Sequence, residues 1–208
     1  MKKITLIFAV ALLMSGICNA QEKRDNLHFG LKVGANLSNV YDAQGQNFVA
    51  DSKSGLAVGT FLSIPLGKVF GIQPEILYSE KGFKSSGTLL GNTYTLNRST
   101  SFIDVPILLA IKPVGFVTFL VGPQYSFLLK QKNSFSGTPI SLEQQKIFES
   151  DNIRKNILSL TGGADINLGT VVIGARASFD TQNNNGDGTS TTPRYKNVWY
   201  QATFGVRF

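Results

Sequence analysis

The sequence contains little of what many catalytic and metal-binding sites require. It has one cysteine, Cys18, and one histidine, His28, in 208 residues. The apolar run from Ile4 to Met14 is only about half of the roughly 20 residues that a membrane-spanning helix needs, and no longer apolar segment follows it. Lysine and arginine outnumber aspartate and glutamate by 20 to 13, but they are scattered without a basic run. We therefore expect no nucleic-acid partner.

The N-terminal segment has the order of a secretory signal peptide. Lys2 and Lys3 precede the apolar run, and small or polar residues follow it up to Ala20. The sequence therefore predicts a cleaved signal peptide at 1–20 and a mature domain at 21–208, with a formal charge reduced from +7 to +5. Without Cys18 the mature chain has no cysteine for a disulfide or a zinc-thiolate site. The alternative is a lipidated Cys18, although such sites favour a small residue where Ile17 stands.

The last twelve residues alternate strictly in polarity. One parity is apolar (Val198, Tyr200, Ala202, Phe204, Val206 and Phe208), and the other is mostly polar. Successive side chains of a strand point to opposite faces, so this pattern predicts a strand with one apolar face. An amphipathic strand that ends on an aromatic residue resembles the last strand of bacterial outer-membrane barrels. The resemblance implies that Phe208 is the signal that the assembly machinery recognises.

The same two-residue period recurs in seven earlier segments. With the last one, the predicted strands are 27–37, 55–64, 70–79, 101–111, 117–129, 158–167, 171–179 and 197–208. The fourth pattern is the least regular, because placing Ser101 and Asp104 on one face requires a change of phase between them. Short joints near 66–68, 112–115 and 168–169 alternate with long loops at 38–53, 81–98, 130–155 and 180–196. Alternating short turns and long loops are typical of transmembrane barrels.

These patterns predict an all-β fold, an eight-stranded antiparallel transmembrane up-and-down β-barrel. A soluble sandwich or lipocalin-like barrel is the alternative, since alternation alone requires only one dry face. The charges favour the membrane barrel, because they share one parity while the other is uncharged. Four prolines within the predicted strands are interpreted as bulges or strand ends, because proline cannot donate to the ladder: Pro65, Pro74, Pro106 and Pro123.

The predicted interior carries a balanced set of charges. Three cations and three anions fall on the inward parity: Lys32, Arg176 and Arg207 with Glu75, Asp104 and Asp165. An unpaired charge in a narrow interior is costly, so ion pairs that stiffen a plugged barrel are expected. The alternative is a selective channel lined by charges, which usually shows a surplus of one sign.

Candidate chemistry is sparse. Enzymatic barrels of this size combine a histidine with a nucleophile or a carboxylate, and His28 stands at the start of the first strand. We interpret it as a rim residue and predict no enzymatic activity and no cofactor. Asn183, Asn185 and Asp187 resemble half of a calcium loop, but Arg194 stands where the bidentate Glu belongs, which favours a plain loop.

Basic residues also occur in the second long loop. Lys81, Lys84 and Arg98 occur there without an acid beyond Glu80, so this loop could contact anionic lipopolysaccharide. The alternative is a solvated loop without a ligand. Other expected partners are outer-membrane lipid, the assembly machinery, and proteins that the long loops would contact.

Several short motifs, in their order along the chain, resemble the PorT-like outer-membrane β-barrel family. They are 29–35 (FGLKVGA), 74–78 (PEILY), 81–82 (KG), 103–109 (IDVPILL), 122–123 (GP) and 204–208 (FGVRF). The resemblance covers Leu27 to Phe208 and implies an eight-stranded barrel. It implies either a structural or interaction protein, with some members tied to protein secretion, or a small porin-like transport protein. It implies no catalytic residues.

Overall fold

The computed structural model describes residues 26–42, 50–89, 92–137, 153–185 and 195–208. The predicted signal peptide at 1–20 therefore lies outside the described residues. The strands are β1 (His28–Asp42), β2 (Ala50–Pro65), β3 (Phe70–Leu89), β4 (Asn92–Val114), β5 (Val117–Gly137), β6 (Asn156–Leu168), β7 (Val171–Asp180) and β8 (Tyr195–Arg207). No helix in the described part of the chain is long and apolar enough to cross a membrane.

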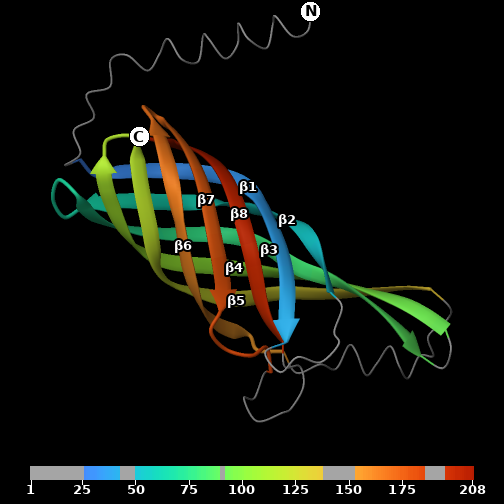
Figure 1. Cartoon of the computed structure of the whole chain (residues 1–208). Helices are drawn as coiled ribbons and strands as arrows, with labels where there is room; N and C mark the ends of the chain where they lie inside the picture. Colours follow the sequence, from blue (N-terminus) through green and yellow to red (C-terminus); the bar gives the residue numbers. More distant parts are fainter. Residues whose placement is uncertain (1–25, 43–49, 90–91, 138–152, 186–194) are drawn as a thin grey trace, which may run out of the picture.

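The eight strands form one closed antiparallel barrel (Figure 1). Each strand pairs with its neighbours in sequence, and β1 closes the barrel against β8 from Gly30↔Arg207 to Asp42↔Tyr195. Closure gives every strand two partners, so the barrel wall presents no open edge. The predicted eight-stranded up-and-down barrel is confirmed.

Apolar side chains dominate the outer face of the barrel, and most buried charged side chains lie on the inner face. Leu31 and Phe204 on the outer face are 46% and 52% exposed, whereas Lys32 and Glu75 on the inner face are 6% and 3% exposed. A soluble barrel would bury its apolar parity instead. This distribution of side chains fits a barrel whose outer face contacts an apolar environment. It excludes the lipocalin-like alternative.

The two ends of the barrel differ. The short turns at 66–69, 115–116 and 169–170 lie at one end together with the C-terminus (Figure 1), which we call the short-turn end. At the opposite end, β3, β4 and β5 extend beyond the other strands. We call this three-stranded part the extension.

The extension contradicts the predicted loop at 81–98. The β3–β4 ladder continues from Lys81↔Thr100 to Leu89↔Asn92, and β4 pairs with β5 up to Tyr94↔Gly137. The sequence of this hairpin is rich in Ser, Thr, Asn and Gly, so the apolar period that marked the earlier strands fades while backbone pairing continues. The loops at 38–53 and 130–155 were likewise predicted too long, because β1, β2 and β5 run into them.

The phase change predicted within β4 lies in β5 instead. Ser101 pairs with Lys130 and Phe102 pairs with Leu128, so Leu129 is an extra residue in β5. Such a bulge shifts the parity of one strand while its partner continues unchanged. Ser101 accordingly faces outward, where its hydroxyl accepts a hydrogen bond from the Tyr78 hydroxyl at 3.0 Å, and was wrongly predicted to face inward.

Three of the four prolines interrupt the ladder without shifting its register. Pro65 ends β2, as predicted. Near Pro74 and Pro106 the β3–β4 pairing breaks off after Pro74↔Ile107 and resumes at Leu77↔Asp104 in the same register. The β4–β5 pairing opposite Pro123 shows the same kind of gap. The bulge interpretation is therefore wrong at these three positions: the missing N–H removes a hydrogen bond but inserts no extra residue.

Inward-facing glycine lets β1 approach β8 closely. A Cβ atom at Gly34 would lie 2.0 Å from the Ala202 carbonyl oxygen. We therefore expect Gly34→Ala to lower the free energy of unfolding by about 1–3 kcal/mol, as overpacking does. Denaturant unfolding in lipid vesicles measures the change. Gly162→Ala is the matched control, because its Cβ would meet nothing closer than the Leu120 carbonyl oxygen at 3.9 Å; equal effects of the two substitutions would contradict this account.

Candidate functional site

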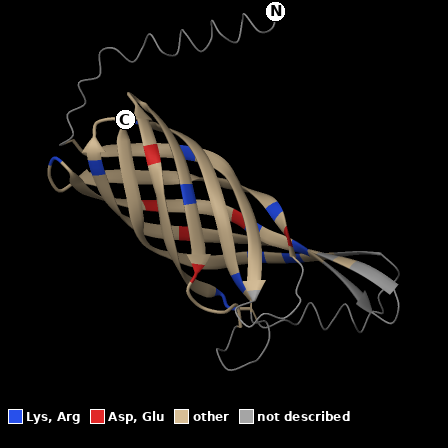
Figure 2. Ribbon diagram, in the orientation of Figure 1, with Lys and Arg blue, Asp and Glu red and all other residues tan. Residues whose placement is uncertain are grey.

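The barrel interior contains a central group of charges from four strands, and residues of both signs lie along the barrel strands (Figure 2). Lys32 on β1 forms an ion pair with Glu75 on β3, and both side chains are almost fully buried. Arg176 on β7 binds Asp165 on β6 with two parallel hydrogen bonds of 2.7 and 2.9 Å. This bidentate geometry is among the strongest that an ion pair adopts.

Glu75 joins the two pairs into one network. Its Oε1 lies 3.7 Å from Nη2 of Arg176 and accepts a hydrogen bond of 2.8 Å from the Gln73 amide. The same amide lies 3.4 Å from Oδ2 of Asp165. Four of the six residues predicted for the interior network thus lie together: Lys32, Glu75, Asp165 and Arg176. We call them, with Gln73, the central network.

A second ion pair lies nearer the extension. Nζ of Lys81 lies 3.0 Å from each oxygen of Asp104, and both side chains are buried. The ammonium also lies 3.7 Å from the ring centroid of Trp199 and 4.8 Å from that of Phe102. Ring faces attract a cation most strongly where water is absent. Lys81, Asp104, Trp199 and Phe102, from three strands, thus form one buried cluster inside the barrel, and we call them the cation–π plug.

Lys81 was not among the predicted interior residues, because the sequence placed it in a loop. Asp104 was predicted on the inward parity but without this partner. The signal that could have found Lys81 is the continuation of the parity of Leu77 and Ser79, both of which are buried. Arg98, assigned to the same loop, is also buried on the inner face, whereas Lys84 is exposed.

Asp180 adds an anion that the sequence analysis assigned to the last long loop. It ends β7, is 2% exposed, and accepts hydrogen bonds from Ser159 at 2.8 Å and from the Asn197 backbone at 3.1 Å. The Asn197 side-chain amide donates a further one. Neutral donors on β6 and β8 thus stabilise this buried carboxylate.

Cations occupy both ends of the interior. At the short-turn end, Arg207 donates to the Gly169 carbonyl oxygen at 2.8 Å and to Asn167 at 3.2 Å, away from the central network in which it was predicted. Lys112 donates there to Ser63 at 3.1 Å. Neutral oxygens therefore contact these cations.

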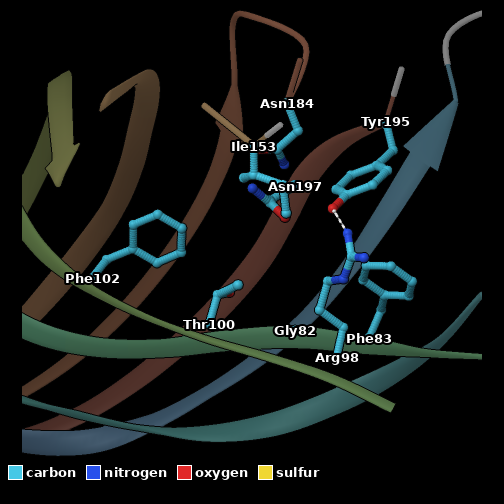
Figure 3. A pocket seen from close by; sticks show the side chains of 9 residues that line it. All are labelled: Gly82, Phe83, Arg98, Thr100, Phe102, Ile153, Asn184, Tyr195 and Asn197. Atoms are coloured by element: carbon cyan, nitrogen blue, oxygen red, sulfur yellow. Dashed lines mark hydrogen bonds between the residues drawn. The ribbon is translucent and has the colours of Figure 1, made fainter. Parts of the chain in front are cut away.

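At the opposite end Arg98 lies beside two aromatic rings that contact each other edge to face. Its guanidinium carbon is 5.7 Å from the Phe83 ring and 5.9 Å from the Tyr195 ring, and it donates to the Tyr195 hydroxyl at 2.5 Å (Figure 3). The pocket that these residues help to line has a volume of about 10 Å³, room for a single water molecule.

The charge count of the interior differs from the predicted balance of three and three. Among the described residues, the buried charged side chains are six cations (Lys32, Lys81, Arg98, Lys112, Arg176 and Arg207) and four anions (Glu75, Asp104, Asp165 and Asp180). The additional ones were predicted to lie in loops or turns. The ion pairs described above lie in the middle, and Arg98, Lys112 and Arg207 lie nearer the ends.

The remaining candidates are peripheral. His28 lies at the short-turn end, with Nδ1 3.3 Å from the Phe208 carbonyl oxygen. The Phe208 side chain is 72% exposed, and its backbone N–H donates to Phe29. Asn183 and Asn185 are described, but Asp187 and Gly188 of the possible calcium loop lie outside the described residues. Within the described ranges, no group of three His, Cys, Asp or Glu residues could hold a metal ion.

A comparison with protein families agrees with this architecture. The sequence matches the family described as outer membrane protein beta-barrel domain over residues 19–182. A comparison with curated proteins gives no match.

Similar solved structures include three bacterial proteins. Ail, the attachment invasion locus protein of Yersinia pestis, is 11% identical, with 87% of this chain and 98% of Ail covered at a TM-score of 0.44. Neisserial surface protein A is 13% identical, with 86% and 97% covered at a TM-score of 0.46. The outer membrane protein OprG from Pseudomonas aeruginosa is 13% identical, with 88% and 95% covered at a TM-score of 0.43.

Proposed function

This chain belongs to the outer membrane protein beta-barrel domain family and lies in the outer membrane, and we propose that it is a sealed barrel with a structural or interaction role. In such barrels the short turns face the periplasm and the longer connections face outward. The short-turn end is then periplasmic, and the extension projects from the outer surface.

The filled interior is the observation that carries this proposal. The central network and the cation–π plug contribute buried side chains from β1, β3, β4, β6, β7 and β8 at two successive heights. An eight-stranded barrel has an interior that side chains can fill. A permeating ion would have to separate pairs such as Arg176 and Asp165, leaving buried charges without partners, which costs several kcal/mol per ion.

The interior pairs would then serve stability, and the outward extension would serve contact with partners. The resemblance to the PorT-like family supports a finer proposal, in which the barrel accompanies protein secretion or another surface apparatus. We propose no enzymatic role: His28 contacts a backbone carbonyl oxygen, and the described residues provide no hydrogen-bond partner for its Nε2. Phe208, exposed at the periplasmic end, is the proposed contact of the assembly machinery.

Photo-crosslinking in cells tests the interaction role. A photoreactive residue at Ser134, which is exposed on the β5 extension, is expected to form adducts with a partner protein. The same residue at Leu160, which faces lipid, is the matched control and is expected to give none. A deletion strain is then expected to lose secretion or surface integrity. Absence of adducts at Ser134, with unchanged secretion and surface but reduced solute uptake, would contradict the proposal.

A small channel is the second candidate function, and the presence of buried cations near both ends of the interior favours it. Arg98 at the outer end and Lys112 and Arg207 at the periplasmic end could attract anions. Efflux of a small anion from liposomes that contain the purified barrel separates the two functions. The sealed barrel predicts efflux no faster than from protein-free liposomes, and anion-selective efflux would support the channel.

A further inference from the structure

The outer face of β3–β5 changes from apolar to polar within two residues. Tyr78, Ile103 and Phe127 form one outward row across β3, β4 and β5. The next row toward the outside is Glu80, Ser101 and Lys130, and the row after it is Gly82, Ser99 and Lys132. Apolar side chains belong at the depth of the acyl chains, so the polar rows lie at the height of the lipid headgroups.

Lys53 is built into this face. Its side chain starts on β2, where the β2–β3 register is irregular between Ser52 and Ala57, and its Nζ donates to Ser99 and to Asn97 on β4, the latter at 2.8 Å. It thus passes over β3 at Gly82. A Cβ atom at Gly82 would lie 3.2 Å from Cδ of Lys53, so the missing side chain opens the path for the lysine.

Two further lysines lie beside Lys53. Partial burial lowers the pKa of Lys53, and the charges of Lys84 and Lys132 lower it further while Glu80 opposes them. Lys84 and Lys132 are exposed. Nζ of Lys53 contacts Asn97 and Ser99 on β4, which pair with Lys84 on β3 and Lys132 on β5. The ladder therefore brings Lys53, Lys84 and Lys132 together on the outward surface, and we call them the lysine cluster.

The acids of this face offset the cluster only in part. The described residues of β2–β5 at this height include two acids, Glu80 and Asp51. They include four lysines, which are the three of the lysine cluster and Lys130. The Glu80 carboxylate already has hydrogen-bond partners, since it accepts from the Tyr78 hydroxyl at 3.0 Å and from the Leu56 backbone N–H at 3.3 Å. Asp51 pairs across the ladder with Lys84. A net positive surface at headgroup depth favours an anionic group there.

We propose that the lysine cluster binds a phosphate group of lipopolysaccharide in the outer leaflet. The inference rests on the outward orientation of the extension in the proposed function. A phosphate on the sugar headgroup lies at the junction of acyl chains and water, which is the height of the cluster. Lysine recognises phosphate as a point charge, so three converging ammonium groups suit a monoester better than the weakly charged headgroup of a zwitterionic lipid.

Binding of lipid A, the phosphorylated membrane anchor of lipopolysaccharide, tests the site. The intact barrel in zwitterionic detergent is titrated with bisphosphorylated lipid A, and its thermal unfolding is followed by heat-dependent gel mobility. Lys84→Gln with Lys132→Gln is expected to weaken binding about tenfold or more, since each lost charge-assisted contact contributes on that scale. Lys53 stays unchanged, because its hydrogen bonds also join strands.

The control removes a charge from the opposite end of the barrel. Lys68→Gln alters an exposed lysine in the periplasmic β2–β3 turn, and is expected to bind lipid A like the unchanged protein. Dephosphorylated lipid A is expected to bind the unchanged protein as weakly as the cluster variant binds the phosphorylated form. Equal losses in both variants, or equal binding of both lipids, would overturn the proposal.

Inorganic phosphate distinguishes a lipid site from a free-anion site. Millimolar phosphate is expected to leave lipid A binding unchanged, because the acyl chains add contacts with the apolar rows below the cluster. Full competition by phosphate alone would overturn the assignment to lipid. Failure of this site and failure of the sealed-barrel proposal remain separable. A barrel that conducts ions could still bind phosphorylated lipid A through the lysine cluster. A sealed barrel could bind lipid A without using the cluster lysines.

Discussion

Replacing Glu75 with Leu is expected to lower the free energy of unfolding by about 3–5 kcal/mol, the usual cost of removing one partner from a buried ion pair. Glu75 is the acid that contacts both Lys32 and Arg176. Without it, Lys32 keeps a buried charge with no carboxylate in contact. Denaturant unfolding in lipid vesicles, followed by gel mobility and circular dichroism, measures the loss.

A double variant separates the missing charge from the missing volume. Glu75→Leu combined with Lys32→Met removes both charges at similar volume, and Arg176 still keeps its two bonds to Asp165. We expect this variant to recover most of the stability, since buried ion pairs are often replaceable by apolar residues. Glu80→Gln on the outer face is the control for losing one acid. A Glu75→Leu barrel as stable as the control would contradict the account of the central network.

Replacing Trp199 with Ala is expected to cost about 3–5 kcal/mol and to loosen the cation–π plug, as large-to-small substitutions at buried aromatics do. Trp199 is 1% exposed and is among the largest fully buried side chains among the described residues. Its loss leaves a cavity and takes away the ring that lies 3.7 Å from Lys81.

The neighbouring Tyr200 provides the matched control. Its side chain points to the outer face and is 63% exposed, so lipid refills the space that Tyr200→Ala vacates. Circular dichroism and gel mobility report unfolding for both variants, because Trp199 is the single tryptophan of the chain. A loss at Tyr200 as large as that at Trp199 would show that the interior ring contributes no special packing.

The two-residue period predicted the wall of the barrel because lipid and lumen impose opposite polarities on alternate residues. In β7 the outward Ile173 and Ala175 alternate with the inward Gly174 and Arg176 as the sequence indicated. Short turns could be predicted as well, because a tight turn often requires a conformation that favours glycine. Gly169, between β6 and β7, adopts such a conformation with a φ of 63°.

The extension could not be predicted by the same rule. Polar residues continue on both parities there, so Ser85 and Thr95 pair across their ladders without an apolar period to mark them. The predicted interior was incomplete for the same reason, because Lys81 and Arg98 were assigned to a loop. The Leu129 bulge also escaped notice, since an extra residue in β5 shows in the sequence only as a change of parity.

The partners of the interior charges required the three-dimensional register. Sequence parity placed Lys32, Glu75, Asp165 and Arg176 on one face, but their heights depend on how far neighbouring strands are shifted. The structure brings these four together and leaves Arg207 near the Gly169 turn. Parity therefore predicts which residues face inward, and strand stagger determines which of them meet.

Single-channel recording tests the central claim that the lumen is closed. The purified, folded protein is inserted into planar lipid bilayers under an applied voltage, with a porin of known conductance as the positive control. A lumen closed by the central network and the cation–π plug predicts a flat baseline after insertion. Stable, ohmic current steps from the unchanged protein would contradict the account.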